Sequence, residues 1–387
     1  MRRLAFLLAG LVLLVAGCGK GSSSGEAGRL VIAVDVPVTG SPYIADTIRQ
    51  GVELATSNLN GGGGVRVGSK SYLIKVKLYD NHLSARTAVQ NARRAIDAGA
   101  VAIVTDGTGV DATWQLAKRA GVSIAIAHDG GTGLVDAQAR PNVFRIAPTN
   151  HGIAFRYAEY LIPKKLKVGL LSDDSGYGRE GAADIGRAFS SNPESVALKL
   201  TLPAGQTDLT PQILRARRAG ATALLVWGQP PTIAAALSAA RSIGWKVPFY
   251  TPPTGSDPFI RQQLADHPDW VDGLTFAGGR LTAEVGTGPF TNFQSQYEST
   301  YGADQVGVKN SQGQAVVQPP EFAMYSYDFM HVLLAAIAHA GSIEPAKITA
   351  ALNQVTTQGA NGDERGFNEH SHVESSTTTS ISHASAT

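Results

Sequence analysis

The sequence predicts an α/β protein made of two doubly wound parallel-sheet lobes. Apolar runs of strand length alternate with amphipathic stretches of helix length along most of the chain. Right-handed crossovers between such strands build a parallel sheet with helices on both faces. The alternation starts afresh after Pro148, which predicts a second sheet and not an extension of the first. With 387 residues, the chain is long enough for two full hydrophobic cores.

The first half of the chain is expected to form the first sheet, because its apolar residues recur with strand and helix periods in turn. Strands are expected at residues 30–36, 72–79, 101–104, 123–127 and 143–146, and helices at residues 45–58, 85–97 and 111–120.

The second series is expected to form the second sheet by the same reasoning. Strands are expected at residues 167–171, 196–202, 223–226, 247–250 and 274–277, and helices at residues 153–161, 181–189, 209–219 and 233–243. Three later helices, at 290–300, 321–340 and 345–353, have no clear strands between them and are expected to return to the first lobe. The last dozen residues are polar and are expected to be disordered.

The N-terminus has the pattern of a lipoprotein signal peptide. Two arginines precede an apolar run of about 13 residues, which is too short to span a bilayer as a permanent helix. The run ends in Val-Ala-Gly followed by Cys18, the only cysteine of the chain. Residues 1–17 therefore form the expected signal peptide, and Cys18 is the expected site of lipid attachment. An ordinary secretory signal with an incidental cysteine is the alternative.

Residues 18–28 are rich in glycine and serine, which predicts a flexible tether between the lipid anchor and the folded body. The expected location is therefore the extracytoplasmic face of the cell membrane, with the lipid bilayer as a partner through acylated Cys18. A single cysteine also excludes internal disulfides, so the fold must depend on core packing.

The charge balance excludes several classes of function. The chain has 33 Lys and Arg against 31 Asp and Glu, and loss of Arg2 and Arg3 with the signal peptide leaves 31 of each. No cluster of basic residues with interleaved aromatics is present, so nucleic acid is not an expected partner. The turn Asp80-Asn81-His82 lacks a second group of ligands at metal spacing. No metal or cofactor is expected.

In the order and spacing of its short motifs, the chain resembles the branched-chain amino-acid-binding family of ABC-transporter receptors, the type I periplasmic binding proteins. The resemblance covers nearly the whole mature chain. The motifs that carry it are Pro37-Val38-Thr39-Gly40, Gly51-Val52-Glu53, Asn58-Leu59-Asn60-Gly61-Gly62, Tyr79-Asp80-Asn81, Phe144-Arg145-Ile146-Ala147-Pro148, Gly176-Tyr177-Gly178, Tyr327-Asp328 and Ala340-Gly341-Ser342.

The resemblance implies two lobes joined by a hinge of three crossovers, with the ligand bound in the cleft at the carboxyl ends of the strands. Lobe 1 is expected to comprise residues 29–148 and 280–356, and lobe 2 residues 149–279 and 357–387. The crossings are expected near residues 147–151, 276–281 and 355–359.

In lobe 1 the resemblance assigns the ligand's carboxylate to the loop of Gly107 and Thr108, which opens a helix and so offers free N–H groups. Simple helix capping by Thr108 or Asp106 is the alternative. Thr132, in the next contact loop with Asp129, is the best match to the family's carboxylate-binding threonine. Tyr43 could edge the cleft or be an ordinary surface tyrosine.

In lobe 2 the resemblance assigns ligand contacts to Tyr177, Trp227 and Gln229, and Tyr177 is expected just before a helix. Amino-acid binders of the family carry an acidic residue in the following loop to pair with the ligand's ammonium, whereas this chain has Thr254 at the matching place. We therefore expect a ligand with a carboxylate or equivalent acceptor but without an obligatory α-ammonium, unless Asp129 or Asp257 compensates.

These features bear on three possible functions. The expected function is that of a monomeric solute-binding lipoprotein that takes a small polar ligand, such as an amino acid, an amide or a small carboxylate, to the membrane permease of an ABC uptake transporter. A ligand-sensing receptor subunit with a separate signalling partner is the alternative. An enzyme that uses His128 and Asp129 is disfavoured, because no serine or cysteine nucleophile in a suitable turn accompanies them.

Overall fold

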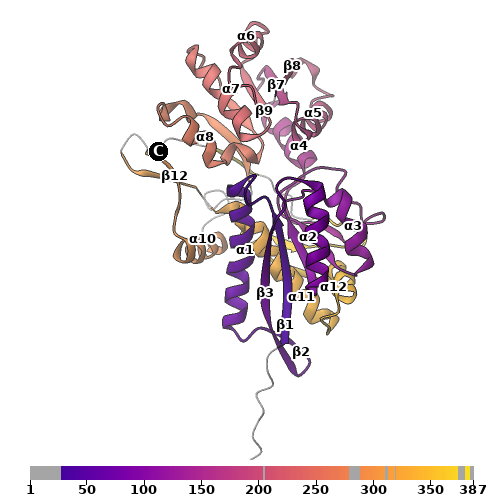
Figure 1. The fold of residues 1–387 in the computed structure, drawn as a ribbon. Helices are drawn as coiled ribbons and strands as arrows, with labels where there is room; N and C mark the ends of the chain where they lie inside the picture. Colours follow the sequence, from indigo (N-terminus) through magenta and orange to yellow (C-terminus); the bar gives the residue numbers. More distant parts are fainter. Residues whose placement is uncertain are drawn as a thin grey trace, which may run out of the picture.

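The computed structural model describes residues 28–203, 205–278, 288–309, 313–318, 320–373 and 380–383. These residues form two lobes, one above the other in Figure 1. The expected signal peptide, Cys18 and all but the last residue of the expected tether lie outside the described residues, so those expectations remain predictions.

The first sheet has six strands in the order β2-β3-β1-β4-β5-β6. All neighbours pair in parallel except β2 and β3, which form an antiparallel hairpin that the sequence analysis did not anticipate. The strands are β1 (Gly28–Val36), β2 (Val65–Val67), β3 (Lys70–Asp80), β4 (Ala100–Thr105), β5 (Ser123–Ile126) and β6 (Val143–Arg145).

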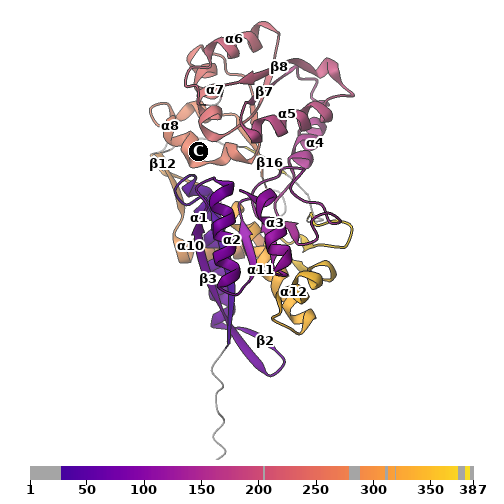
Figure 2. The same cartoon turned by 45° about the vertical axis from the view of Figure 1, so that its right-hand side comes forward.

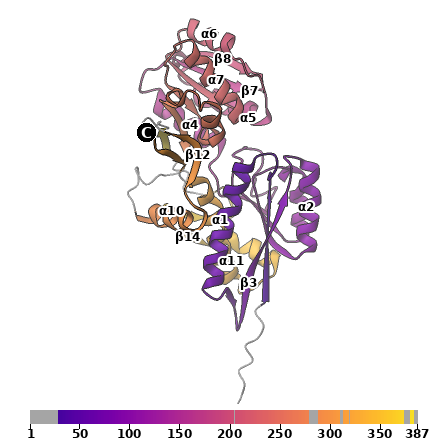
Figure 3. The ribbon, with the colours of Figure 1, turned by 60° about the vertical axis from the view of Figure 1, so that its left-hand side comes forward.

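Helices cover both faces of this sheet. In Figure 3, α1 and α11 lie on one side of the strands and α2 on the other. On the α2 side, Ala92, Ile103 and Ile124 belong to one buried apolar cluster. The helices of this lobe are α1 (Pro42–Gly61), α2 (Ala85–Asp97), α3 (Val110–Arg119), α10 (Gly288–Tyr301), α11 (Glu321–Ala340) and α12 (Pro345–Ala351).

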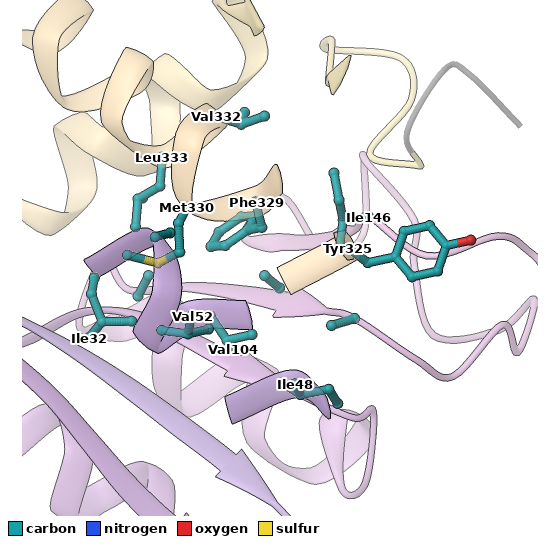
Figure 4. Packing of buried hydrophobic residues seen from close by; sticks show 14 of the residues in the cluster. Ile32, Ile48, Val52, Val104, Ile146, Tyr325, Phe329, Met330, Val332 and Leu333 are labelled. Atoms are coloured by element: carbon teal, nitrogen blue, oxygen red, sulfur yellow. The ribbon is translucent and has the colours of Figure 1, made fainter. Parts of the chain in front are cut away.

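The late helix α11 supplies much of the core of the first lobe. Phe329, Met330 and Leu333 are at most 1% exposed, and they belong to the same apolar cluster as Ile48 and Val52 of α1 (Figure 4). Gly51 allows the two helices to approach closely, since a Cβ there would lie 2.2 Å from the carbonyl oxygen of Ala323. The predicted return of the late helices to the first lobe is therefore observed.

No single helix within the described ranges is long and apolar enough to cross a membrane. The segments 322–340 and 345–354 meet that criterion only as a pair bent by 108°, and α11, which contains the first of them, lies in the core just described.

The second sheet has the order β16-β11-β10-β9-β7-β8, and all its pairs are parallel except β11 with β16. Its strands are β7 (Val168–Asp173), β8 (Val196–Leu202), β9 (Ala223–Trp227), β10 (Phe249–Thr251), β11 (Leu274–Gly278) and β16 (Ser380–His383). Its helices are α4 (Asn150–Leu161), α5 (Gly176–Ala188), α6 (Thr210–Arg218), α7 (Pro230–Ser242) and α8 (Pro258–Gln263). Short 3-10 turns in this lobe are η1 (Pro193–Ser195), η2 (Pro253–Ser256) and η3 (Pro268–Val271), and η4 (Leu352–Gln354) belongs to the first lobe.

The described elements alternate between the lobes, with three changes of lobe along the chain. The chain leaves β6 for α4, returns from β11 to α10, and finally passes from the first lobe to β16 at the edge of the second sheet (Figure 2). The predicted α/β fold with two parallel-stranded sheets is confirmed.

The third crossing differs from the expected one. Residues 357–373, which were expected in lobe 2, lie against lobe 1: β14 (Thr356–Gln358) and β15 (Glu364–Gly366) form a hairpin beside α11, and Phe367 is part of the lobe 1 core. The ring of His372 stacks on Phe144 with centroids 4.2 Å apart. Burial of these rings holds the segment on lobe 1 until at least Val373, which pairs with Arg145.

Two further expectations require correction. Strands β12 (Asp304–Lys309) and β13 (Ala315–Gln318) form a hairpin between α10 and α11, where no strand was expected, and β12 packs against α8 of lobe 2. In the tail, Ser380–His383 forms strand β16 where disorder was expected. The open edge of β11 explains this strand, because it offers a row of unpaired backbone groups to any nearby extended segment.

Candidate functional site

A cavity of about 830 Å³ lies between the two lobes, which is a volume typical of small-molecule sites. Its lining comes from the loops that follow β1, β3, β4 and β5 in lobe 1 and β7, β9 and β10 in lobe 2, and from Phe322 of α11. These loops lie at the carboxyl ends of parallel strands, where open α/β sheets bind ligands. Aromatic rings and six prolines form much of the wall: Tyr43, Tyr177, Phe259, Phe322, Pro37, Pro42, Pro230, Pro231, Pro253 and Pro258.

In lobe 1 the loop after β4 is organised around the carboxylate of Asp106. The Thr108 hydroxyl donates to its Oδ2 at 2.6 Å, and the Asn81 side-chain amide donates to its Oδ1 at 2.8 Å. Asn81 also donates to the carbonyl of Asp35 at 3.3 Å, so it joins the ends of β1, β3 and β4. Burial raises the pKa of Asp106, and the hydrogen bonds from Thr108 and Asn81 oppose that shift.

The loop after β5 lies directly against the loop after β4. The amide of Asp129 donates to the carbonyl oxygen of Asp106 at 2.7 Å. Gly107 has a φ of +122°, and a Cβ there would lie 2.4 Å from the Cβ of Asp129. A glycine is therefore required at position 107 for the backbone conformation and for the close contact of the two loops.

Arg145 supports the loop after β5 from below. Its Nε donates to the carbonyl of Asp129 at 2.9 Å, and its Nη2 donates to the carbonyl of Gly131. The side chain is 1% exposed, and burial lowers the pKa of its guanidinium to about 10, while Asp129 and Glu180 oppose that shift. Arg145 therefore positions the loop through main-chain carbonyls and does not line the cavity.

In lobe 2 the buried carboxylate of Asp173 positions two contact loops. Its Oδ1 accepts hydrogen bonds from the amide and hydroxyl of Ser175, and its Oδ2 accepts from the amide of Gln229 at 2.8 Å. Ser175 caps α5, so Tyr177 lies in the first turn of that helix. The sequence had predicted a position just before the helix. The helix begins at Gly176 because this cap outweighs the poor helix propensity of the glycines that follow.

Tyr177 faces the cavity, and Trp227 lies behind it with ring centroids 5.9 Å apart. Trp227 is fully buried and does not line the cavity. Thr254 lines it, and its hydroxyl donates to the carbonyl of Gly228 at 2.8 Å. Burial raises the pKa of Tyr177, and a hydrogen bond with Thr254 opposes that shift.

Six of the nine residues expected at the ligand lie in the cavity wall, namely Tyr43, Thr108, Asp129, Tyr177, Gln229 and Thr254. Gly107, Thr132 and Trp227 do not line it. Thr132 is exposed to solvent, because the chain turns away from the cleft after Asp129, whose Oδ1 accepts the Gly131 amide at 2.8 Å.

The structure also contradicts the expectation that the loop of Gly107 and Thr108 is free to receive a ligand carboxylate. The Thr108 hydroxyl and the Gly107 amide have partners within the loop, in Asp106 and in the Thr105 hydroxyl respectively. Helix capping by Thr108 or Asp106 is not observed either, because the N-cap of α3 is Gly109 and no side chain accepts a hydrogen bond from the first turn of this helix.

Sequence reasoning missed the roles of Asp106, Asn81 and Asp173 in building the site. Asp106 directly follows strand β4, and Asp173 is the last residue of strand β7. Both therefore lie at the carboxyl end of a parallel strand. That position does not reveal which neighbouring loop each carboxylate would bind. The neighbouring loop depends on the order of the strands in the sheet.

His128 and Asp129 are adjacent at the cavity wall, but they do not form a catalytic pair with a nucleophile. Burial lowers the pKa of His128, and Asp106 and Asp129 oppose that shift. The serines of the wall are Ser41, which precedes α1, and Ser256, whose hydroxyl donates to the carbonyl of Pro253 at 2.8 Å. Across the described ranges, no group of three His, Cys, Asp or Glu residues is placed to hold a metal ion.

Known proteins agree with this architecture. A relative from Brucella abortus named "Leu/Ile/Val-binding protein homolog 8" is 26% identical in an alignment of 290 positions that covers 69% of each chain. The crystal structure of a leucine-binding protein from Thermotoga maritima superposes with a TM-score of 0.73 at 20% identity, covering 88% of this chain and 92% of that one. A solute-binding protein of Rhodopseudomonas palustris in complex with benzoate superposes with a TM-score of 0.70 at 16% identity, covering 89% and 90%.

The sequence profile of the family described as "Periplasmic binding protein" matches residues 30–379, which include every loop of the cavity wall and all strands of both sheets except β16 and the first two residues of β1. Proteins of this family bind solutes and are not enzymes. This confirms the prediction that the chain is not an enzyme that uses His128 and Asp129. The chain belongs to the periplasmic binding protein family, with the fold of type I members.

Proposed function

We propose that this protein is the extracytoplasmic solute-binding component of an ABC uptake transporter. The observation that carries the proposal is the cavity of about 830 Å³, which is lined from both lobes at the carboxyl ends of their strands. A small polar ligand would bind there, the lobes would close around it, and the closed monomer would deliver it to a membrane permease.

The proposed ligand is a small polar molecule, and family names alone do not define its class. One relative is named for leucine, isoleucine and valine, and one structural neighbour binds benzoate. Thr254 donates to a main-chain carbonyl and brings no carboxylate to the place expected for one. Asp257 lines the same side of the cavity, and its side chain accepts from the Phe259 amide at 2.9 Å as the cap of α8.

Ligand binding is expected to compact the protein, because the lobes are connected by crossovers and share a cavity. The protein would be incubated with a polar cell extract, and native mass spectrometry would identify the retained small molecule. Small-angle scattering with that molecule at saturation should then show a smaller radius of gyration than without it. Failure to retain any small molecule from extracts of several growth conditions would contradict a solute-binding function.

We also propose that the protein is anchored by lipid on Cys18. The support is the Val-Ala-Gly-Cys sequence after a short apolar run. Two or more acyl chains give stable anchoring where one does not. Replacing Cys18→Ser should move the protein from the membrane fraction to the soluble fraction and remove the acyl mass from its N-terminal peptide. A wild-type protein that is soluble and without acyl mass would contradict anchoring.

A further inference from the structure

We propose that the ligand is a small organic cation, an amine, amidine or guanidine with net positive charge, whose N–H groups face Asp106 and Asp129 of lobe 1. This inference rests on the proposed function and specifies the class of solute that the interlobe cavity accepts.

The first observation is that donors beside α3 are already used by the chain's own carboxylate, Asp106. The N-terminus of α3 is a place where free amides and the helix dipole favour an anion. Asp106 lies just before this helix without capping it, and its carboxylate accepts hydrogen bonds from both the hydroxyl and the amide of Thr108. A ligand carboxylate at this position would meet a carboxylate and not a set of donors.

The second observation is that Asp129 adds another acceptor beside the first. The two residues are tied by the hydrogen bond from the Asp129 amide to the Asp106 carbonyl, and both line the cavity. Oδ1 of Asp129 accepts the Gly131 amide, and no donor among the described residues lies within hydrogen-bond distance of Oδ2. Carboxylates accept hydrogen bonds only, so the pair selects donors on the ligand.

The third observation is that the cavity wall offers no positive charge to an anion. Its charged residues are Asp106, Asp129 and Asp257, and none of its described residues is a lysine or arginine. The buried guanidinium of Arg145 donates to main-chain carbonyls, and Nη1 of Arg261 donates to the carbonyl of Ser256 at 3.5 Å. His128 contributes an aromatic face, since burial favours its neutral form.

These groups together explain why a cation is favoured over a neutral amino acid. A zwitterion would bring a carboxylate that no described lysine or arginine of the wall can pair. A cation would supply a counter-charge to Asp129 and to Asp106, whose oxygens accept only neutral donors from Asn81, Thr105 and Thr108. Buried charges are stable when paired and hydrogen-bonded. The aromatic rings of Tyr43, Tyr177 and Phe322 suit the apolar part of such a ligand and can face its charge.

The test uses the folded protein without its signal peptide and a polar cell extract divided by ion exchange at neutral pH into cationic, unretained and anionic fractions. The unretained fraction contains the zwitterionic amino acids. Thermal unfolding is measured with each fraction. The cationic fraction should raise the melting temperature, and the other two should not.

Two variants and one matched control assign the effect to lobe 1. Asp129→Asn and Asp106→Asn each remove one cavity carboxylate, and each should weaken binding of the active cationic component by about 10- to 100-fold, as expected for loss of a charge-assisted hydrogen bond. Asp111→Asn makes the same change of charge on α3, where its side chain is 68% exposed and paired with Arg140, and should leave affinity unchanged. If Asp106→Asn does not fold, Asp129→Asn alone decides.

Each outcome has one meaning. Stabilisation by the unretained or anionic fraction but not by the cationic one would overturn the inference and leave solute binding intact. Stabilisation by no fraction would contradict the proposed function as well. A cationic ligand whose affinity is unchanged by Asp129→Asn would also overturn the inference, because residues other than Asp129 would then bind its positive charge.

Discussion

Replacing Arg365 with methionine should lower the free energy of unfolding by about 3–5 kcal/mol, because it leaves a buried carboxylate without its counter-charge. Nε of Arg365 lies 3.0 Å from Oδ2 of Asp328, and the two side chains are 3% and 1% exposed. The other oxygen of Asp328 accepts the amide of Ala360 at 2.8 Å. The pair therefore fastens the β14–β15 hairpin to α11.

A double variant distinguishes the unpaired charge from lost packing. Asp328→Asn keeps an acceptor for the Ala360 amide, so Asp328→Asn with Arg365→Met should be more stable than Arg365→Met alone. Lys347→Met is the matched control: it breaks an ion pair with Glu344 whose side chains are 62% and 56% exposed, and it should cost less than about 1 kcal/mol. Urea unfolding at neutral pH measures the free energy of unfolding of Arg365→Met, of the double variant and of Lys347→Met. Equal losses from the buried and the exposed pair would contradict this account.

Replacing Asp35 with asparagine should stabilise the protein at pH 8 by up to about 4 kcal/mol. Asp35 is 5% exposed at the end of β1, and burial raises the pKa of its carboxyl from 3.8 to about 7, although Asn91 donates to it at 2.8 Å. Asp106 and Asp80 add to the shift by repulsion. The change of about three pKa units corresponds to about 4 kcal/mol at 1.36 kcal/mol per unit.

The sign follows from proton release. Below about pH 3.8 both the folded and the unfolded chain keep the proton on Asp35, and its ionisation costs nothing. Between about pH 3.8 and 7 the unfolded chain has lost the proton while the folded chain retains it, so stability falls as pH rises, and above about pH 7 the loss is constant. The asparagine variant lacks this term but retains an oxygen that can accept the Asn91 amide.

Urea unfolding of wild type and Asp35→Asn from pH 4 to pH 8 gives the difference in stability directly. The difference should be small at pH 4 and grow until about pH 7. Asp97→Asn, an exposed change of the same kind at the end of α2, is the matched control. Parallel curves for wild type and Asp35→Asn would show that the Asp35 carboxyl titrates normally in the folded protein.

Hydrophobic periodicity was sufficient to place most elements of both sheets. The predicted helices at 85–97 and 321–340 and the predicted strand at 196–202 agree with α2, α11 and β8 at both ends. Their boundaries are local, because apolar spacing, caps and glycines lie within the segment itself. The short hairpins were missed because β2, β12 and β14 have only three to six residues, which is too few to show a clear hydrophobic period.

The positions of the contact loops were also predictable, and their hydrogen bonding was not. A loop at the carboxyl end of a strand must face the cleft in this fold, which is why six of the nine expected residues line the cavity. Spacing does not reveal whether the donors of Thr108 face outward or are used by Asp106, because the choice depends on side-chain rotamers and on the position of Asn81 after the neighbouring strand.

The sequence by itself therefore determined the two-lobed α/β fold, its order of elements and the edge of each sheet at which the cleft lies, because these follow from local periodicity and from the handedness of crossovers. Only the tertiary structure decided which lobe holds residues 357–373, where the Arg365–Asp328 pair and Phe367 join segments that the sequence keeps apart. It also decided the sign of the charge in the cavity, since that depends on which buried donors are already paired within the protein.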